Sequence, residues 1–225
     1  MDHYSLDSYL SINKFLSRFK ANQQNLILIP YVICLLIFAF SGCAIQTPVP
    51  DDSLSPRWEK NKLGLEQIDS WNMRGRVAIQ LDKESGSASL NWKQVHDDYV
   101  IKIIAPFGKG SLELVGNLHG VTMRDANNQL QHASKPETLL QAYLGWQVPL
   151  TGMKHWILGL PDPVHEILNM VLDENAQISE LSQAGWQVKY GRYTQANELS
   201  LPAKIEMKNQ NLKVKLVIKK WELSQ

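Results

Sequence analysis

Apolar and polar residues alternate with a period of two along most of the chain after residue 70. The alternation is clearest in residues 73–81, 87–93 and 212–218. A period of two predicts antiparallel strands that bury one face and expose the other. Turn residues separate further runs of this kind, at residues 98–105, 111–116, 119–125, 128–132, 167–173, 176–182, 186–191 and 203–208. The pattern therefore predicts about 10–11 antiparallel strands.

Three other segments carry apolar residues at helical spacing. Ser55, followed by Pro56, is the predicted N-cap of the first helix. Ser134 and Glu137 match a capping box before the second. The apolar stripes of the second and third helices are Leu139, Leu140, Tyr143 and Leu144, and Met153, Trp156, Ile157 and Leu160. The predicted fold is mainly β (α+β), with one curved antiparallel sheet or an incomplete, unclosed antiparallel β-barrel and helices covering one side.

The N-terminal segment differs from the rest of the chain. Residues 26–40 contain no charged side chain, and Lys14, Arg18 and Lys20 precede them. A helix of this length spans about 22 Å, which is short of the ~30 Å hydrocarbon core of a bilayer. The order of a basic lead, a short apolar run and small residues predicts a secretory signal. A short transmembrane anchor is the alternative.

The end of the apolar run resembles a bacterial lipobox, with Phe40-Ser41-Gly42 before Cys43. This predicts a covalent diacylglycerol and an N-acyl chain on Cys43 and no other cofactor, because the thiolate is the nucleophile that can accept the lipid. By the sorting rule of many such lipoproteins, Ala44 implies the outer membrane. The expected organisation is a lipoprotein signal peptide (1–42), a lipidated N-terminus with a flexible tether (43–55) and a single domain (56–225).

Composition and motifs give little indication of catalysis or metal binding. The net charge of +1 argues against nucleic-acid binding through a basic surface. His165-Glu166 begins a zinc-protease motif, but Asn169 stands where the second histidine is required. We predict neither an enzyme nor a metal site. Two alternatives remain open, a hydrolase that uses His155 or His165 and a purely structural envelope lipoprotein.

All seven tryptophans lie after the apolar segment, several of them on predicted buried faces. They indicate either an ordinary core or an apolar cavity large enough for an acyl chain. The candidate cavity residues are Trp92, Ile103, Leu144, Trp156 and Trp186.

A predicted turn carries an apolar residue that gains nothing from water. Pro106 lacks a backbone N–H and Gly108 tolerates positive φ, so Pro106-Phe107-Gly108 joins two strands. Phe107 either folds back over the core or protrudes towards an apolar environment.

Several motifs in order resemble the LolB family of outer-membrane lipoprotein receptors. They are the lipobox, Trp71-x-x-Arg74-Gly75-Arg76, the Trp92 strand, Pro106-Phe107-Gly108, Trp156-Ile157-Leu158-Gly159-Leu160-Pro161 and Gly185-Trp186-Gln187-Val188-Lys189-Tyr190-Gly191. The resemblance implies a LolA/LolB-like barrel with a helical lid that binds lipoproteins received from a LolA-type periplasmic carrier. It also implies that Phe107 helps to deliver the acyl chains of client lipoproteins into outer-membrane phospholipid. The expected protein is a monomer, lipid-anchored in the outer membrane and facing the periplasm, with no nucleic-acid partner.

Overall fold

The computed structural model describes residues 54–224, except 82–83, 107–109 and 146–147. Its strands are β1 (Ser70–Leu81), β2 (Glu84–Val95), β3 (Asp98–Ile104), β4 (Ser111–Asn117), β5 (Gly120–Arg124), β6 (Leu130–Ala133), β7 (Ile167–Leu172), β8 (Ile178–Gln183), β9 (Trp186–Ala196), β10 (Leu199–Lys208) and β11 (Leu212–Leu223). Its helices are α2 (Leu54–Glu66), α3 (Pro136–Leu144) and α4 (Leu150–Leu158). Within this described part, no helix is both long enough and apolar enough to cross a membrane.

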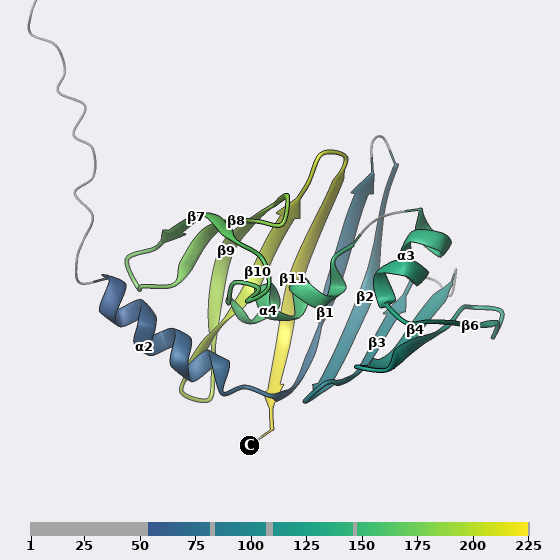
Figure 1. The fold of residues 1–225 in the computed structure, drawn as a ribbon, viewed down its shortest axis with the longest axis horizontal. Helices are drawn as coiled ribbons and strands as arrows, with labels where there is room; N and C mark the ends of the chain where they lie inside the picture. Colours follow the sequence, from purple (N-terminus) through teal and green to yellow (C-terminus); the bar gives the residue numbers. More distant parts are fainter. Residues whose placement is uncertain (1–53, 82–83, 107–109, 146–147, 225) are drawn as a thin grey trace, which may run out of the picture. The chain divides into compact units, whose positions relative to one another are not determined.

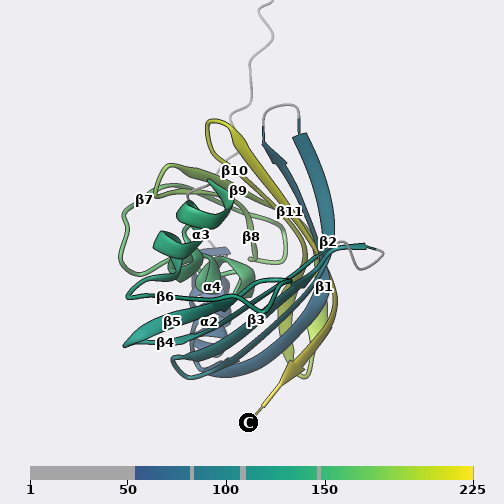
Figure 2. The ribbon, with the colours of Figure 1, turned by 90° about the vertical axis from the view of Figure 1, so that its right-hand side faces the viewer.

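The strands form one curved antiparallel sheet, and the helices lie on its concave side (Figures 1 and 2). The strand order is β6-β5-β4-β3-β2-β1-β11-β10-β9-β8-β7. The two edge strands, β6 and β7, are not paired with each other, so the sheet does not close into a barrel. This confirms the predicted unclosed barrel of antiparallel strands with helices over one side.

The first and last strands are neighbours in the middle of this sheet. β1 pairs with β11 from Trp71↔Leu223 to Leu81↔Leu212, and it pairs with β2 along its whole length on the other side. The alternation in these strands matches their burial, because Val214, Leu216 and Ile218 face the core while the outward positions, Lys213, Lys215, Val217 and Lys219, are exposed or half-exposed. The period-two pattern therefore predicted correctly which residues of β11 face inward.

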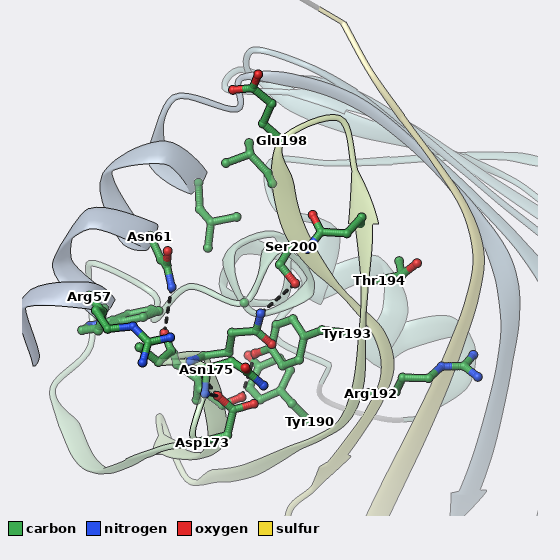
Figure 3. Close-up of a pocket in the computed structure, with 18 of the residues that line it drawn as sticks. Arg57, Asn61, Asp173, Asn175, Tyr190, Arg192, Tyr193, Thr194, Glu198 and Ser200 are labelled. Carbon is green, nitrogen blue, oxygen red and sulfur yellow. Dashed lines mark hydrogen bonds between the residues drawn. The ribbon is translucent and has the colours of Figure 1, made fainter. Parts of the chain in front are cut away.

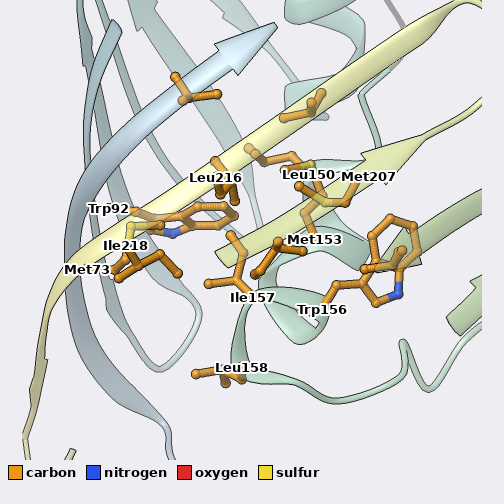
Figure 4. Packing of buried hydrophobic residues seen from close by; sticks show 14 of the residues in the cluster. Met73, Trp92, Leu150, Met153, Trp156, Ile157, Leu158, Met207, Leu216 and Ile218 are labelled. Carbon is orange, nitrogen blue, oxygen red and sulfur yellow. The ribbon is translucent and has the colours of Figure 1, made fainter. Parts of the chain in front are cut away.

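Helix α4 fills the central part of the concave side. Trp156 and Ile157 are fully buried, and Met153 and Leu158 are nearly so. They pack against inward-facing side chains of β1, β10 and β11 (Figure 4). The helix ends at Gly159, whose φ of 82° is a left-handed conformation that glycine adopts without strain.

A buried glutamine joins α4 to the sheet. The Gln183 side chain accepts hydrogen bonds from Trp156 Nε1 (2.9 Å) and from the Asp162 backbone N–H (2.8 Å). Its amide nitrogen donates to the backbone carbonyls of Asp162 (2.8 Å) and His165 (2.7 Å). Every polar atom of this fully buried side chain is thus paired, as a polar group in a core requires.

Both predicted helix caps are wrong. α2 already includes Leu54, so Ser55 lies within the helix and cannot cap it. α3 begins at Pro136 with Lys135 as its N-cap, and no side chain caps it. Glu137 is not available for a capping box, because its carboxylate accepts hydrogen bonds from the Thr151 backbone N–H (2.9 Å) and hydroxyl (2.8 Å). Glu137 instead connects α3 to the start of α4.

Strands β9 and β10 are longer than the predicted 186–191 and 203–208. Their hairpin continues to the pair Ala196↔Leu199, with Asn197 at a φ of 53° in the turn. The residues added to β9 are mostly polar and exposed, whereas those added to β10 include the buried Leu201 and Pro202, so neither stretch alternates between apolar and polar residues. Backbone pairing and contacts of Leu201 and Tyr193 with the core extend the hairpin, and a search for alternating apolar residues misses it.

Candidate functional site

The concave side carries an apolar groove that the helices leave unfilled. The groove has a volume of about 350 Å³, which lies within the range of roughly 300–1,000 Å³ typical of ligand pockets. Its lining comes from β1, β2 and the end of β3, and consists of Val77, Ile79, Leu81, Glu84, Ser85, Gly86, Ser87, Ala88, Ile103 and Ala105. We call this the acyl groove.

The groove exists because β2 carries small residues at its inward positions here. Gly86 lies opposite Ile79, and Ala88 lies opposite Val77. A Cβ atom added at Gly86 would meet no other atom within 4 Å, so there is open space above this position. Further along β2 the inward positions carry Leu90 and Trp92, which are buried in the core. The side chains of β2 therefore change from core-filling to groove-lining along one strand.

The interior of the acyl groove is nearly free of charge. Glu84 is the one ionisable residue among the described residues of its lining, and it stands at the end of the β1–β2 hairpin opposite Leu81. Ile79, Leu81, Ala88 and Ile103 are half-buried, so the lining is apolar and still accessible. Such a lining suits a hydrocarbon chain, which offers no hydrogen bonds to compensate a buried polar group.

One end of the groove meets the segment that contains Phe107. Ala105 lines the groove, and its backbone N–H donates to the Gly110 carbonyl (2.9 Å), which joins the two ends of the segment. Pro106 is exposed. Phe107 and Gly108 lie outside the described residues, and so their roles stay predictions.

A second, larger pocket is polar and does not fit an acyl chain. It has a volume of about 640 Å³ and lies between α2, the β7–β8 connection and the β9–β10 hairpin (Figure 3). Hydrogen bonds cross it, from Asn61 Nδ2 to the Ala176 carbonyl (3.1 Å) and from Gln177 Nε2 to Ser200 Oγ (2.7 Å). These contacts tie α2 and the β7–β8 turn to the sheet. An acyl chain in this pocket would remove polar groups from water without replacing their hydrogen bonds.

The predicted cavity residues do not lie together in the structure. Ile103 lines the acyl groove. Trp92, Trp156 and Trp186 do not line it and are buried in the core, where Trp156 and Trp186 pack with ring centroids 6.4 Å apart. The Leu144 side chain lies outside the described part of the chain. A role of the three tryptophans in acyl binding stays a prediction.

The main groove residues, Val77, Ile79, Leu81 and Ala88, were missed by the sequence analysis. Alternation predicted correctly that these positions face inward. The signal that could have found the groove is the pairing of this apolar stretch with the small residues of the next strand. The proposed lipidation and sorting residues, Cys43 and Ala44, lie outside the described residues.

The hydrolase alternative depends on His155 and His165, and the surroundings of both residues suit a structural role. His165 Nδ1 lies 2.6 Å from Asp162 Oδ2, and Asp162 also accepts the Val164 backbone N–H (3.0 Å). His155 is half-buried, and burial lowers its pKa below the usual 6.5. No hydroxyl or thiol of the described residues hydrogen-bonds to His155 or His165, so no nucleophile–histidine pair is visible there.

Known sequences match this chain over most of its length. The family model described as "Outer membrane lipoprotein LolB" matches residues 69–221. A Nitrosococcus oceani protein named outer-membrane lipoprotein LolB is 35% identical over 193 residues, which is 85% of this chain and 96% of that protein. A protein of the same name from Pseudomonas syringae pv. syringae is 36% identical over 194 residues, with 85% and 94% covered.

Solved structures show only a distant likeness. A putative outer membrane lipoprotein-sorting protein domain from Vibrio parahaemolyticus aligns with a TM-score of 0.48 at 8% identity, over 77% of this chain and 92% of that one. A LolA superfamily protein from Nitrosomonas europaea aligns with a TM-score of 0.45 at 8% identity, over 77% and 93%. The assignment therefore depends on the sequence matches, which are long and well above chance similarity. On those matches, the chain belongs to the LolB family of outer-membrane lipoproteins.

Proposed function

We propose that this outer-membrane lipoprotein receptor takes an acyl chain of a client lipoprotein into the acyl groove and then passes it to the membrane. The client would arrive on a LolA-type periplasmic carrier, and its acyl chains would enter the inner leaflet of the outer membrane. The observation that carries the proposal is the groove itself, an open apolar lining on the concave side with small residues on one wall. Neither the family match nor the structure favours a structural or enzymatic role without lipid transfer.

Hydrophobic burial is sufficient to drive this function without a catalytic group. Hiding one CH₂ group from water contributes about 0.8 kcal/mol, so a long acyl chain contributes roughly 10 kcal/mol. A chain this apolar leaves its carrier very slowly if it must pass through water. Direct transfer between apolar sites avoids that exposure. The direction of transfer then requires only that the receptor binds the acyl chain better than the carrier does, and that the bilayer binds it better still.

Anchoring and delivery complete the proposal. Cys43 would carry the diacylglycerol and N-acyl lipid, and Ala44 would permit transport to the outer membrane. Phe107 would enter the bilayer surface or contact the acyl chain during release, since it lies in the segment that begins at the end of the groove. Lipid transfer through a groove requires only one protomer, so a monomer suffices.

The test replaces Phe107 by glutamate. A carboxylate at this position makes contact with hydrocarbon unfavourable, so Phe107→Glu should still accept a client from the carrier but should fail to place it in vesicles. Phe107→Leu is the matched control and should deliver normally, because it keeps an apolar side chain. The measurement is the distribution of a radiolabelled client among carrier, receptor and vesicles, with thermal melting recorded for each variant. Normal delivery by Phe107→Glu would show that the segment has no part in release.

A further inference from the structure

Basic side chains gather on the outer face of the sheet, the face turned away from the helices. The outward positions of β1, β3, β9, β10 and β11 carry Arg74, Arg76, Lys102, Lys189, Lys204, Lys208, Lys213, Lys215 and Lys219. Four glutamates share this face, and each already forms an ion pair with a lysine: Glu113, Glu180, Glu206 and Glu222. The near-zero net charge of the chain therefore conceals a basic outer face.

Within this face lies a shallow groove of about 310 Å³ that four basic side chains surround. We call it the basic groove. Two rows of paired residues cross it from β1 to β3, Arg74–Asn91–Lys102 and Arg76–Ser89–Ile104. Lys219 of β11 lines the remaining side. The groove thus presents guanidinium and ammonium groups together with the amide and hydroxyl of Asn91 and Ser89.

A bulge in the sheet shapes the basic groove. The β1–β11 register shifts between Arg74 and Gly75, which leaves Lys219 without a partner residue on β1. The backbones come so close here that a Cβ atom at Gly75 would clash with the Val217 carbonyl oxygen. A bulge re-aims side chains locally, and in this case it places an additional lysine beside the two arginines.

The charge within the basic groove is only partly balanced. Lys102 Nζ lies 2.8 Å from Glu113 Oε1, and Arg74 lies 3.6 Å from Glu222, which also contacts Lys220 at 2.6 Å. Arg76 and Lys219 have no carboxylate within 4 Å among the described residues. The one hydrogen bond that Arg76 donates to a described residue is a long one to the Ser87 hydroxyl (3.4 Å). The groove therefore retains an excess of positive charge that favours an anion.

We propose that the basic groove binds the phosphate of an anionic phospholipid and holds the outer face of β1–β3 against the membrane surface. Guanidinium groups bind phosphate through paired hydrogen bonds, and lysines add point charges that attract an anionic surface. Ile104 supports a lipid surface as the partner, because its apolar side chain is 53% exposed at the edge of the same groove. The outer-membrane location of the family keeps such a surface within reach of the chain.

The position of the basic groove also relates it to delivery. Ile104 ends β3 and is followed directly by the segment that contains Phe107. A phosphate bound here would hold that segment close to the lipid surface. The proposal rests on the membrane location of the family, not on the delivery role proposed for Phe107, so the two proposals can fail separately.

The test measures how close the outer face comes to lipid headgroups in the mature, lipid-anchored chain. Ala78 is exposed on the outer face of β1, two residues from Arg76, so Ala78→Cys places a fluorophore beside the basic groove. The chain has two cysteines, Cys34 in the predicted signal peptide and Cys43 at the lipidation site, so the added thiol is the reactive one. The anchored protein is placed in vesicles that contain a lipid with a nitroxide on its headgroup. Quenching of the fluorescence is compared between phosphatidylcholine vesicles and vesicles in which about a quarter of the lipid is phosphatidylglycerol.

Anionic vesicles should quench the fluorophore roughly twofold more, and about 0.5 M salt should remove the difference. The pair Arg76→Gln and Lys219→Gln should lower quenching to the phosphatidylcholine level. The control pair Lys204→Gln and Lys208→Gln removes the same charge from exposed positions of the outer face that form no ion pair with a described residue, and it should change quenching little. Equal quenching in phosphatidylcholine and anionic vesicles would overturn the proposal. An equal loss of quenching in the two double variants would overturn it as well. The assay contains no client or carrier, so its result is independent of lipoprotein transfer.

Discussion

Replacing Gln183 by leucine is expected to lower the free energy of unfolding by about 3–5 kcal/mol, although leucine is apolar and of similar size. The change removes the partners of Trp156 Nε1, of the Asp162 backbone N–H and of two carbonyls. Each buried polar group left without a partner costs about 1–3 kcal/mol. Because Gln183 is fully buried, water has little access to these groups. We expect the melting temperature to fall by on the order of 10 °C.

The control for this experiment is Gln187→Leu. Gln187 lies on the neighbouring strand β9 at an exposed, outward position, and so the same substitution there should change stability by less than about 0.5 kcal/mol. The measurement is chemical denaturation of both variants beside the parent protein. If Gln183→Leu unfolds at the same denaturant concentration as Gln187→Leu, the hydrogen bonds of Gln183 do not hold α4 to the sheet.

Ile79→Glu is expected to reduce acyl binding by about tenfold or more, which corresponds to at least roughly 1.4 kcal/mol. Ile79 is half-buried in the wall of the acyl groove, and a carboxylate there would have to lose water when a hydrocarbon chain enters. The affinity can be measured by titration with a fluorescent acyl probe. A second assay then measures the transfer of a client from the carrier.

The adjacent residue offers the matched control. Ala78 is exposed on the outer face of the same strand, so Ala78→Glu adds the same charge one residue away without reaching the groove. Ala78→Glu should bind the probe as the parent protein does. The free energy of unfolding of both variants should lie within about 2 kcal/mol of the parent value. Equal affinities of the two variants would mean that acyl chains bind elsewhere.

The architecture could be predicted to a large extent because alternation records directly which residues face the core. Residues 212–218 indicated a strand with lysines outside, and β11 has that arrangement. The ends of elements were less predictable, since other contacts determine them. Glu137 forms hydrogen bonds with Thr151 in a different helix, and Tyr193 in the extended part of β9 donates a hydrogen bond to the Ile178 carbonyl of β8. Neither interaction produces a local pattern in the sequence.

The site was harder to predict for a related reason. The tryptophans were chosen as cavity candidates because they are large, but Trp156 is fully buried in the core. The open groove occurs where side chains are small, at Gly86 and Ala88. The basic groove depends on the pairing of β1, β2 and β3 and on one bulge, which bring Arg76 and Lys219 together from distant parts of the chain. Only strand register reveals such neighbours.

The most direct test of the acyl groove is site-specific photocrosslinking during transfer. A photoreactive amino acid is placed at Ile79, inside the groove, or at Gln80, the next residue on the outer face. The carrier then presents a client lipoprotein with radiolabelled acyl chains. The account predicts that illumination attaches labelled acyl chain to the protein at position 79 and not at position 80, because successive residues of a strand face opposite sides. Equal labelling at both positions, or completed transfer without labelling at position 79, would contradict the account.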